Sequence, residues 1–447
     1  MLPQQCNCAI EKRLRDDAHE MSELLLITGC AQLVTLSGPA PRRGPALNDL
    51  GIIHDGALLV RDGVVAAVGP RRKVEGLVAR NGKYRRAEKL DLGGRVLLPG
   101  FVDSHTHLVS PASRASEYEQ RIAGASYEQI ARSGGGILFT VRKLRAASSD
   151  ALKQRALAAL KNFAAHGTTT LEAKSGYGLD AASELKILRL HRQLLELQPL
   201  DITSTFLGAH VVPPEFRRRS NGADAYVDSL ARKLIPAVAR AGLAQFCDVF
   251  CDRGAFTVAQ ARRILTAGRA CGLEPRLHAE QLARTGATRL AVQLNAASAD
   301  HLEKINREDI SALAVSNVVA TLLPGCCFHL GLRDYAPARA LITAGAIVAL
   351  ASDFNPGTSP TLNMQMVLSL ACTQMRMTPA EALAAATINA AYSLRRHDRI
   401  GSIEVGKYAD LAVFDLADYR EIPYYFGVNH CWLTLKRGKI IFSRVNQ

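Results

Sequence analysis

The chain has 447 residues, of which 48% are hydrophobic, 6% aromatic and 21% charged, and its formal net charge is +14 at pH 7. This composition allows a sizeable buried core, and no stretch approaches the ~18 consecutive apolar residues of a membrane-spanning helix. The basic residues are scattered and do not alternate with aromatic ones, which argues against nucleic-acid binding. A positive field also suits an anionic small substrate. Ten cysteines without a CxxC pair and a polar N-terminus predict a cytoplasmic protein.

The two ends of the chain share one style of sequence. Residues 1–20 are polar and charged, and we expect a disordered tail there. Residues 21–98 read as short strands broken by turns, with Asp62-Gly63 as a hairpin turn. Residues 401–447 return to short strands after the long middle segment. Because the termini of a domain tend to lie close together, we expect 21–98 and 401–447 to form one small β-sandwich domain.

Residues 99–400 alternate short apolar runs with helix-length stretches. Eight such runs predict an α/β fold of the (β/α)₈ TIM-barrel type. The stretch TVAQARRILTAGRACG is expected to be a helix that stops near Gly272. The stretch TPAEALAAATINAAYSL is expected to be one helix, with Thr378 and Glu381 in a capping box. The eight runs are GFVDSHTH, TTTLEAKSG, ITSTFLGAH, AQFCDVFCD, EPRLHAEQ, NAASADHL, VVATLLPG and AIVALASD.

Histidines and an aspartate stand at the ends of the predicted strands, where barrels of this type place their active sites. Strand 1 ends in His105 and His107, and alternate residues of a strand point to the same side. Strands 3, 5, 6 and 8 end in His210, His278, His301 and Asp353. A pair of surface histidines in a turn would explain HTH alone, but not histidines on several strands. The set predicts a divalent-metal site, because imidazole and carboxylate ligands suit Zn²⁺ or iron.

This pattern of HxH, two further histidines and an aspartate resembles the amidohydrolase superfamily of metal-dependent barrels. The C-terminal stretch GSIEVGKYADLAVFD also resembles the return of that superfamily into its β domain. Within the superfamily, the chain is similar to the imidazolonepropionases over most of its length from Met21. That similarity is carried by RASEYEQRIAGASYEQI, SGGGILFTVR, EAKSGYGL, TFLGAHVVPPEF, HAEQLARTGA and SDFNPGTSP.

The resemblance implies one divalent metal ion, Zn²⁺ or Fe²⁺/Fe³⁺. Its implied ligands are His105, His107, His278 and Asp353. Binuclear members of the superfamily carry a bridging lysine at the end of strand 4, where this chain reads CDVFCDRG and has none. Lys174 follows strand 2 instead. Such a metal makes hydroxide available near neutral pH by lowering the pKa of a bound water.

The resemblance also implies the reaction. It is the hydrolysis of the cyclic amide C–N bond of 4-imidazolone-5-propanoate to N-formimidoyl-L-glutamate, a step of histidine degradation. Asp353 would receive the proton of the attacking water, and His301 would orient the water or stabilise the oxyanion. Arg114 offers a planar fork for the propionate of this small substrate. The implied substrate-binding residues are Arg114, Tyr177, His210, Gln281, Asn355, Gly357 and Thr358, and His210 also counts among the catalytic residues with His301 and Asp353.

Two stretches depart from the family pattern. Residues 110–113 read SPAS where a glycine-rich piece is expected, and Cys326-Cys327 replace bulkier residues. Without the family resemblance, we would interpret Arg114 as a surface arginine and Tyr177 as a turn residue. The two cysteines would be small apolar residues that fill space in the core. Two other functions stay open: another cyclic-amide hydrolase or deaminase on the same scaffold, and a basic binding protein with an inactive barrel. A homodimer is expected because dimers are the commonest oligomers.

Overall fold

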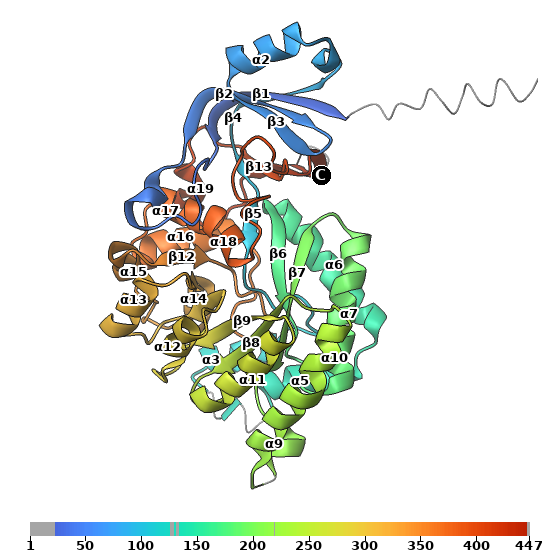
Figure 1. Cartoon of the computed structure of the whole chain (residues 1–447), viewed down its shortest axis with the longest axis vertical. Coiled ribbons are helices and arrows are strands. Elements are labelled where there is room, and N and C mark those ends of the chain that lie inside the picture. Colours follow the sequence, from blue (N-terminus) through green and yellow to red (C-terminus); the bar gives the residue numbers. More distant parts are fainter. Residues whose placement is uncertain (1–22, 126–128, 131–133, 219, 445–447) are drawn as a thin grey trace, which may run out of the picture.

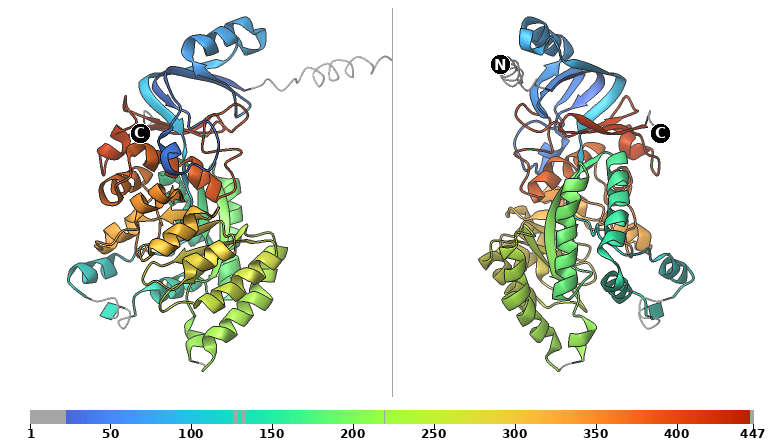
Figure 2. Two further views of the ribbon diagram at one scale, coloured as in Figure 1. Left: turned by 60° about the vertical axis from the view of Figure 1, so that its left-hand side comes forward. Right: turned by 90° about the vertical axis from the view of Figure 1, so that its right-hand side faces the viewer.

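The computed structural model describes residues 23–125, 129–130, 134–218 and 220–444. Its two bodies are an α/β barrel and a smaller mixed β-sheet, which lies at one end of the barrel (Figure 1). In two further views, the N-terminal strands, in blue, and the C-terminal strands, in red, lie together (Figure 2). The expected tail, residues 1–20, falls outside the described residues. None of the described helices is long and apolar enough to span a membrane.

All eight predicted barrel strands are present, and they form one parallel sheet in sequence order from β5 to β12. Most of their residues are buried, as expected of strands that helices cover on one side and side chains fill on the other. The barrel prediction is therefore confirmed. The strands are β5 (Phe101–Asp103), β6 (Thr168–Lys174), β7 (Asp201–Ala209), β8 (Phe246–Cys251), β9 (Glu274–Ala279), β10 (Ser298–His301), β11 (Val319–Leu322) and β12 (Ile347–Leu350).

The first and last strands meet through the residues that follow them. The backbone N–H of Asp353 donates to the carbonyl of His105 at 3.0 Å, and the N–H of His107 donates to Phe354 at 2.8 Å. Below them the N–H of Ser352 donates to a carboxylate oxygen of Asp103 at 3.0 Å. These bonds close the barrel and hold the segments of three predicted metal ligands, His105, His107 and Asp353, side by side.

One of the two expected helices of the barrel domain is found as a single helix. The helix α11 has a capping box at Thr257 and Gln260 and stops before Gly272, whose φ is +84°. The α helices from β5 onward are α3 (Ala115–Ile122), α5 (Ile137–Ala146), α6 (Ser149–Ala165), α7 (Ala181–Leu197), α8 (Pro214–Arg217), α9 (Gly222–Ser229), α10 (Ile235–Arg240), α11 (Val258–Ala270), α12 (Ala287–Gln293), α13 (Arg307–Ala314), α14 (Pro324–Leu330), α15 (Ala338–Ala344), α16 (Met364–Met375), α17 (Pro379–Ala385), α18 (Ile388–Ser393) and α19 (Glu421–Tyr424), and a π-helical turn spans Leu230–Leu234.

The stretch expected to be one helix after the barrel is two helices, α17 and α18. The capping box of Thr378 and Glu381 is present. The helix breaks at Thr387, where φ is −128° and ψ is −89°. The carbonyl of Ala386 accepts a hydrogen bond from the backbone of Val102 in β5 at 3.0 Å, so this turn is tied to the barrel instead of continuing the helix.

The small domain joins both ends of the chain, as predicted, in one mixed sheet ordered β15-β14-β13-β4-β1-β2-β3. Asp62 and Gly63, with φ of +51° and +78°, form the expected hairpin turn. The expectation of strands alone was wrong at Arg71–Arg80, which is helix α2, because Val74 and Val78 pack its one apolar stripe against β2 and β3. The strands are β1 (Leu24–Val34), β2 (Ile52–Arg61), β3 (Val64–Pro70), β4 (Glu88–Pro99), β13 (Leu411–Phe414), β14 (Cys431–Lys436) and β15 (Lys439–Ser443), with 3₁₀ turns at Gly44–Asn48 and Gly82–Tyr84.

A buried histidine in α7 predicts acid sensitivity of the fold. The ring of His191 is fully buried, neither of its nitrogens has a hydrogen-bond partner in the described part of the chain, and burial lowers its pKa to about 3. The pKa of His191 in the unfolded chain is 6.5, so below that pH the unfolded chain binds a proton. The native protein does not bind this proton until the pH falls to about 3. His191 therefore lowers the free energy of unfolding, and this loss grows as pH falls, to about 4–5 kcal/mol.

We expect His191→Leu to flatten the fall in the free energy of unfolding between pH 6 and pH 4, measured by urea denaturation. The matched control is His54→Leu, at an exposed histidine of β2, which should leave the pH slope unchanged. An unchanged slope in His191→Leu would contradict the argument.

Candidate active site

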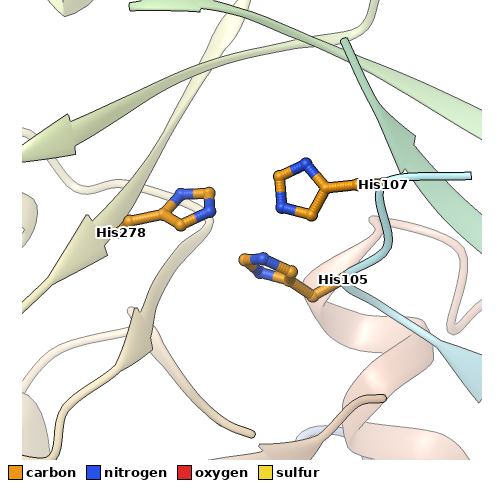
Figure 3. Close-up of side chains that lie close together, drawn as sticks. All are labelled: His105, His107 and His278. Atoms are coloured by element: carbon orange, nitrogen blue, oxygen red, sulfur yellow. The ribbon is translucent and has the colours of Figure 1, made fainter. Parts of the chain in front are cut away.

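Three histidines from two strands face one another at the C-terminal ends of the barrel strands. His105 and His107 follow β5, and His278 lies in β9 (Figure 3). One nitrogen of each ring lies within 4.8 Å of the others, and all three residues are buried. Sequence spacing predicted this convergence, and the structure brings the three rings together.

Asp353 and His301 complete the centre. Together with His105 they form a second group whose ligand atoms lie within 4.8 Å of one another. An oxygen of Asp353 is 3.5 Å from Nε2 of His105 and 3.7 Å from Nε2 of His107. The structure therefore places His301 beside the predicted ligands, close enough to be one itself.

The donor set fits a divalent cation. Among the described residues, Nε2 of His105, Nδ1 of His107 and Nε2 of His278 are buried without a hydrogen-bond partner, while Nδ1 of His278 lies 3.1 Å from a carboxylate oxygen of Asp248. Burial lowers the pKa of His105 and His107 well below the ordinary value, so both rings are neutral and offer lone pairs. Burial raises the pKa of Asp353 to about 6, although His301 and His278 oppose this. A bound cation would satisfy these atoms and favour the carboxylate.

The backbone is strained at the two strand ends that complete the centre. His301, Leu302 and Asp353 have φ of +82°, +72° and +54°, which side chains with a β-carbon rarely adopt. Such conformations persist only where the surrounding structure holds them, and they cluster at functional sites.

Tyr177 and His210 line the centre on one side. Their rings lie 5.5 Å apart, and each lies within 5.4 Å of His107, measured between ring centroids. Burial, helped by His278, lowers the pKa of His210 to about 3, so the ring is neutral. Its Nδ1 lies 3.1 Å from the carbonyl of Gly176, so Nδ1–H donates there and Nε2 is left as an acceptor. Burial raises the pKa of Tyr177, which keeps its hydroxyl protonated as a donor.

Arg114 lies over the loop that follows β12. A β-carbon at Gly357 would come within 2.0 Å of its Nη1, so glycine is needed for this close approach. The guanidinium also pairs with Glu117, with Nη2 2.6 Å from the carboxylate. Glu117 accepts from the backbone N–H of Gly136 as well, at 3.1 Å. The predicted carboxylate-binding arginine is thus placed at the rim of the centre and held there.

The remaining predicted substrate residues lie on neighbouring loops. The side chain of Asn355 contacts Asp353 and residues 357–358 of its own loop, which gives it a role in holding the loop. Thr358 Oγ1 lies 2.9 Å from this amide. The amide nitrogen of Gln281 is 3.5 Å from Sγ of Cys326, and burial keeps the pKa of that thiol well above its usual value. Substrate contacts by these residues stay predictions.

Several charged residues beside the centre were missed from the sequence. Glu303 lies 3.6 Å from Nδ1 of His301, and although burial lowers the pKa of this ring, Glu303 raises it more. Arg121 lies in the last turn of α3, on the same side of the helix as Arg114 at its start. Its Nε and Nη2 are buried and have no hydrogen-bond partner among the described residues. The spacing of residues 114, 117, 118 and 121 on one helix face could have revealed it. Charged residues also fill the barrel below the histidines: Glu172, Lys174, Asp248, Arg276 and Asp300.

Solved structures of similar fold include deaminases. Escherichia coli guanine deaminase matches with a TM-score of 0.69 at 15% identity, covering 94% of this chain and 99% of its own. A zinc-bound adenosine deaminase from Xanthomonas campestris matches with a TM-score of 0.68 at 19% identity, covering 94% of this chain and 93% of its own. At these identities the likeness establishes the fold alone.

Sequence comparison is far more specific. The amidohydrolase family profile matches residues 96–441. The imidazolonepropionase of Geobacillus kaustophilus (strain HTA426) is 46% identical over 421 residues, which cover 94% of this chain and 98% of that protein. The imidazolonepropionase of Solibacter usitatus (strain Ellin6076) is 47% identical over 425 residues, covering 95% and 100%. The chain belongs to the imidazolonepropionase family of the amidohydrolases.

Proposed function

We propose that this protein is an imidazolonepropionase, which hydrolyses the ring C–N bond of 4-imidazolone-5-propanoate to N-formimidoyl-L-glutamate. The observation that carries the proposal is the near-full-length match to imidazolonepropionases together with a converged set of buried histidines and an aspartate. An inactive binding protein would have no use for unpartnered, buried nitrogens at one point. A deaminase of neutral nucleobases would not need Arg114 beside the centre.

We propose one divalent ion, Zn²⁺ or iron, held by His105, His107, His278 and Asp353. The chemistry it supplies is the activation of water and polarisation of a carbonyl near neutral pH. The absence of a lysine from the end of β8 supports a single ion. Elemental analysis should find about one ion per chain, and two would contradict this count.

The protein side chains then divide the work on the substrate. Asp353 accepts a proton from the attacking water and returns it to the ring nitrogen when the C–N bond breaks. His301, whose protonated form Glu303 favours, donates a hydrogen bond to the oxygen that gains negative charge. Nε2 of His210 accepts from a ring N–H, and the Tyr177 hydroxyl donates to the ring. Arg114 pairs with the propionate.

The test of this assignment compares two substrates. Arg114→Ala should lower kcat/KM at least ~10-fold on imidazolone propanoate, because a hydrogen bond to a charged group contributes about 1.5–3 kcal/mol. Arg114→Lys should restore only part, since an ammonium lacks the planar fork. An analogue without the carboxylate should be a poor substrate and lose little further in Arg114→Ala.

Equal losses on both substrates would show that Arg114 does not bind the carboxylate. Arg121 would then be the next candidate rather than Arg142, which is exposed and bonded to the carbonyl of Gly134. The expected cytoplasmic location and homodimer stay predictions, and analytical ultracentrifugation would test the second.

A further inference from the structure

A closed network of charges fills the barrel directly below the predicted metal ligands. It consists of three carboxylates and two cations from four different strands, and each residue is at most 1% exposed. Nothing in the proposed reaction uses these groups. Its members are Glu172 and Lys174 of β6, Asp248 of β8, Arg276 of β9 and Asp300 of β10.

Lys174 lies at the middle of this network. Its Nζ is 2.7 Å from Glu172, 2.8 Å from Oδ2 of Asp248 and 3.7 Å from Oδ2 of Asp300. The opposing carboxylates outweigh the effect of burial and raise the pKa of Lys174, so the side chain is an ammonium. Arg276 lies 3.6 Å from Oδ2 of Asp300, about as near as Lys174, and 4.0 Å from Glu172.

The two aspartates that contact Lys174 also contact two of the metal-site histidines, and each does so through the same oxygen. Oδ2 of Asp248 is 3.1 Å from Nδ1 of His278. Oδ2 of Asp300 is 2.7 Å from Nδ1 of His105, which donates to it. In both rings this leaves Nε2 for the centre, buried and without a hydrogen-bond partner among the residues that the structure describes.

We propose that Lys174 is a positioning residue of the metal centre: its ammonium anchors the carboxylate of Asp248 and, together with Arg276, that of Asp300, and these two carboxylates hold the rings of His278 and His105 with Nε2 toward the metal. The inference rests on the proposed ligand set but not on the identity of the substrate.

The physical reason lies in the charge balance of a dry interior. Three carboxylates facing one another repel, and removing one cation from such a buried group leaves charge without compensation. Arg276 alone lies too far from Asp248 to replace the anchor. Carboxylates that hold the outer nitrogen of a metal-bound histidine typically change metal affinity or activity 10–100-fold when they are lost.

Lys174→Met tests the proposal, because methionine keeps the length of the side chain and removes its charge. The zinc-loaded full-length variant should release metal to a competing chelator with an affinity ~10–100-fold below wild type. Its Co²⁺-substituted form should show a shifted visible absorption spectrum, which reports ligand geometry directly.

The matched control is Lys436→Met. Lys436 is also buried, lies 2.9 Å from Asp201 and 2.6 Å from Asp410, and sits in β14 of the small domain. Losing it should destabilise the fold in the same way while leaving metal affinity and the cobalt spectrum unchanged.

Asp248→Asn provides a second test of metal affinity if Lys174→Met does not fold. The asparagine keeps the shape of the side chain but takes the negative charge away from Nδ1 of His278. It should weaken metal binding in the same direction. Wild-type affinity and spectrum in the folded variants would overturn the proposal, and so would an equal loss in Lys436→Met. Because metal affinity is measured without substrate, a failure here is distinct from a failure to hydrolyse imidazolone propanoate.

Discussion

Asp353→Asn should lower kcat at least ~10³-fold, near the upper part of the range for losing a group that transfers protons in the transition state. An amide can occupy the position of the carboxylate but cannot accept the proton of the attacking water. The residue is also a proposed ligand, so metal content must be measured in the same samples and turnover corrected for it.

A suitable control is Asp201→Asn, which removes an ion-paired aspartate at the start of β7, at the other end of the barrel strands. It should change stability more than turnover. If Asp353→Asn kept more than a tenth of wild-type kcat when loaded with metal, Asp353 could not be the proton acceptor.

His301→Ala is expected to keep its metal and lose kcat by about 10²-fold or more, the scale of removing one donor to a developing oxyanion. KM should change little, because the interaction forms only as the reaction proceeds. The measurement combines steady-state kinetics with metal analysis.

The structure sharpens this test, since His301 lies in one group with His105 and Asp353. Loss of metal from His301→Ala would show that His301 is a ligand. His329→Ala serves as a control, because His329 stacks on Tyr118 and lies outside the two groups of ligand atoms.

The sequence predicted the barrel and the gathering of the metal-site residues well. Strand ends are marked by a change from apolar to polar residues, and the barrel geometry brings all such ends to one rim. His105, His107, His278, His301 and Asp353 could therefore be placed together without knowing any contact.

The charge network below the metal centre could not be found in the same way. Glu172 and Lys174 are alternate residues of β6 and so point to one face, which was a usable signal of charge inside the barrel. Which residues of β8 and β10 face them depends on how these strands are staggered around the barrel, and no local sequence pattern encodes this stagger. Its position after strand 2 excludes Lys174 as a metal bridge, but nothing local in the sequence predicts its pairing with Asp248.

The errors in the helices have similar causes. The break between α17 and α18 depends on a hydrogen bond from Val102, which is far away in the sequence. Helix α2 is short, and its two buried residues, Val74 and Val78, are easily mistaken for part of a strand region. In both cases tertiary contacts decide what local propensity leaves open.

The most direct test of the proposed function is to mix the metal-reconstituted protein with 4-imidazolone-5-propanoate, follow the loss of ring absorbance in the ultraviolet, and identify the product by mass spectrometry. We expect absorbance to fall in proportion to metal-loaded enzyme and the product to be N-formimidoyl-L-glutamate, with no ammonia released. A metal-loaded, folded protein that leaves the ring intact, or that releases ammonia from it, would contradict the assignment.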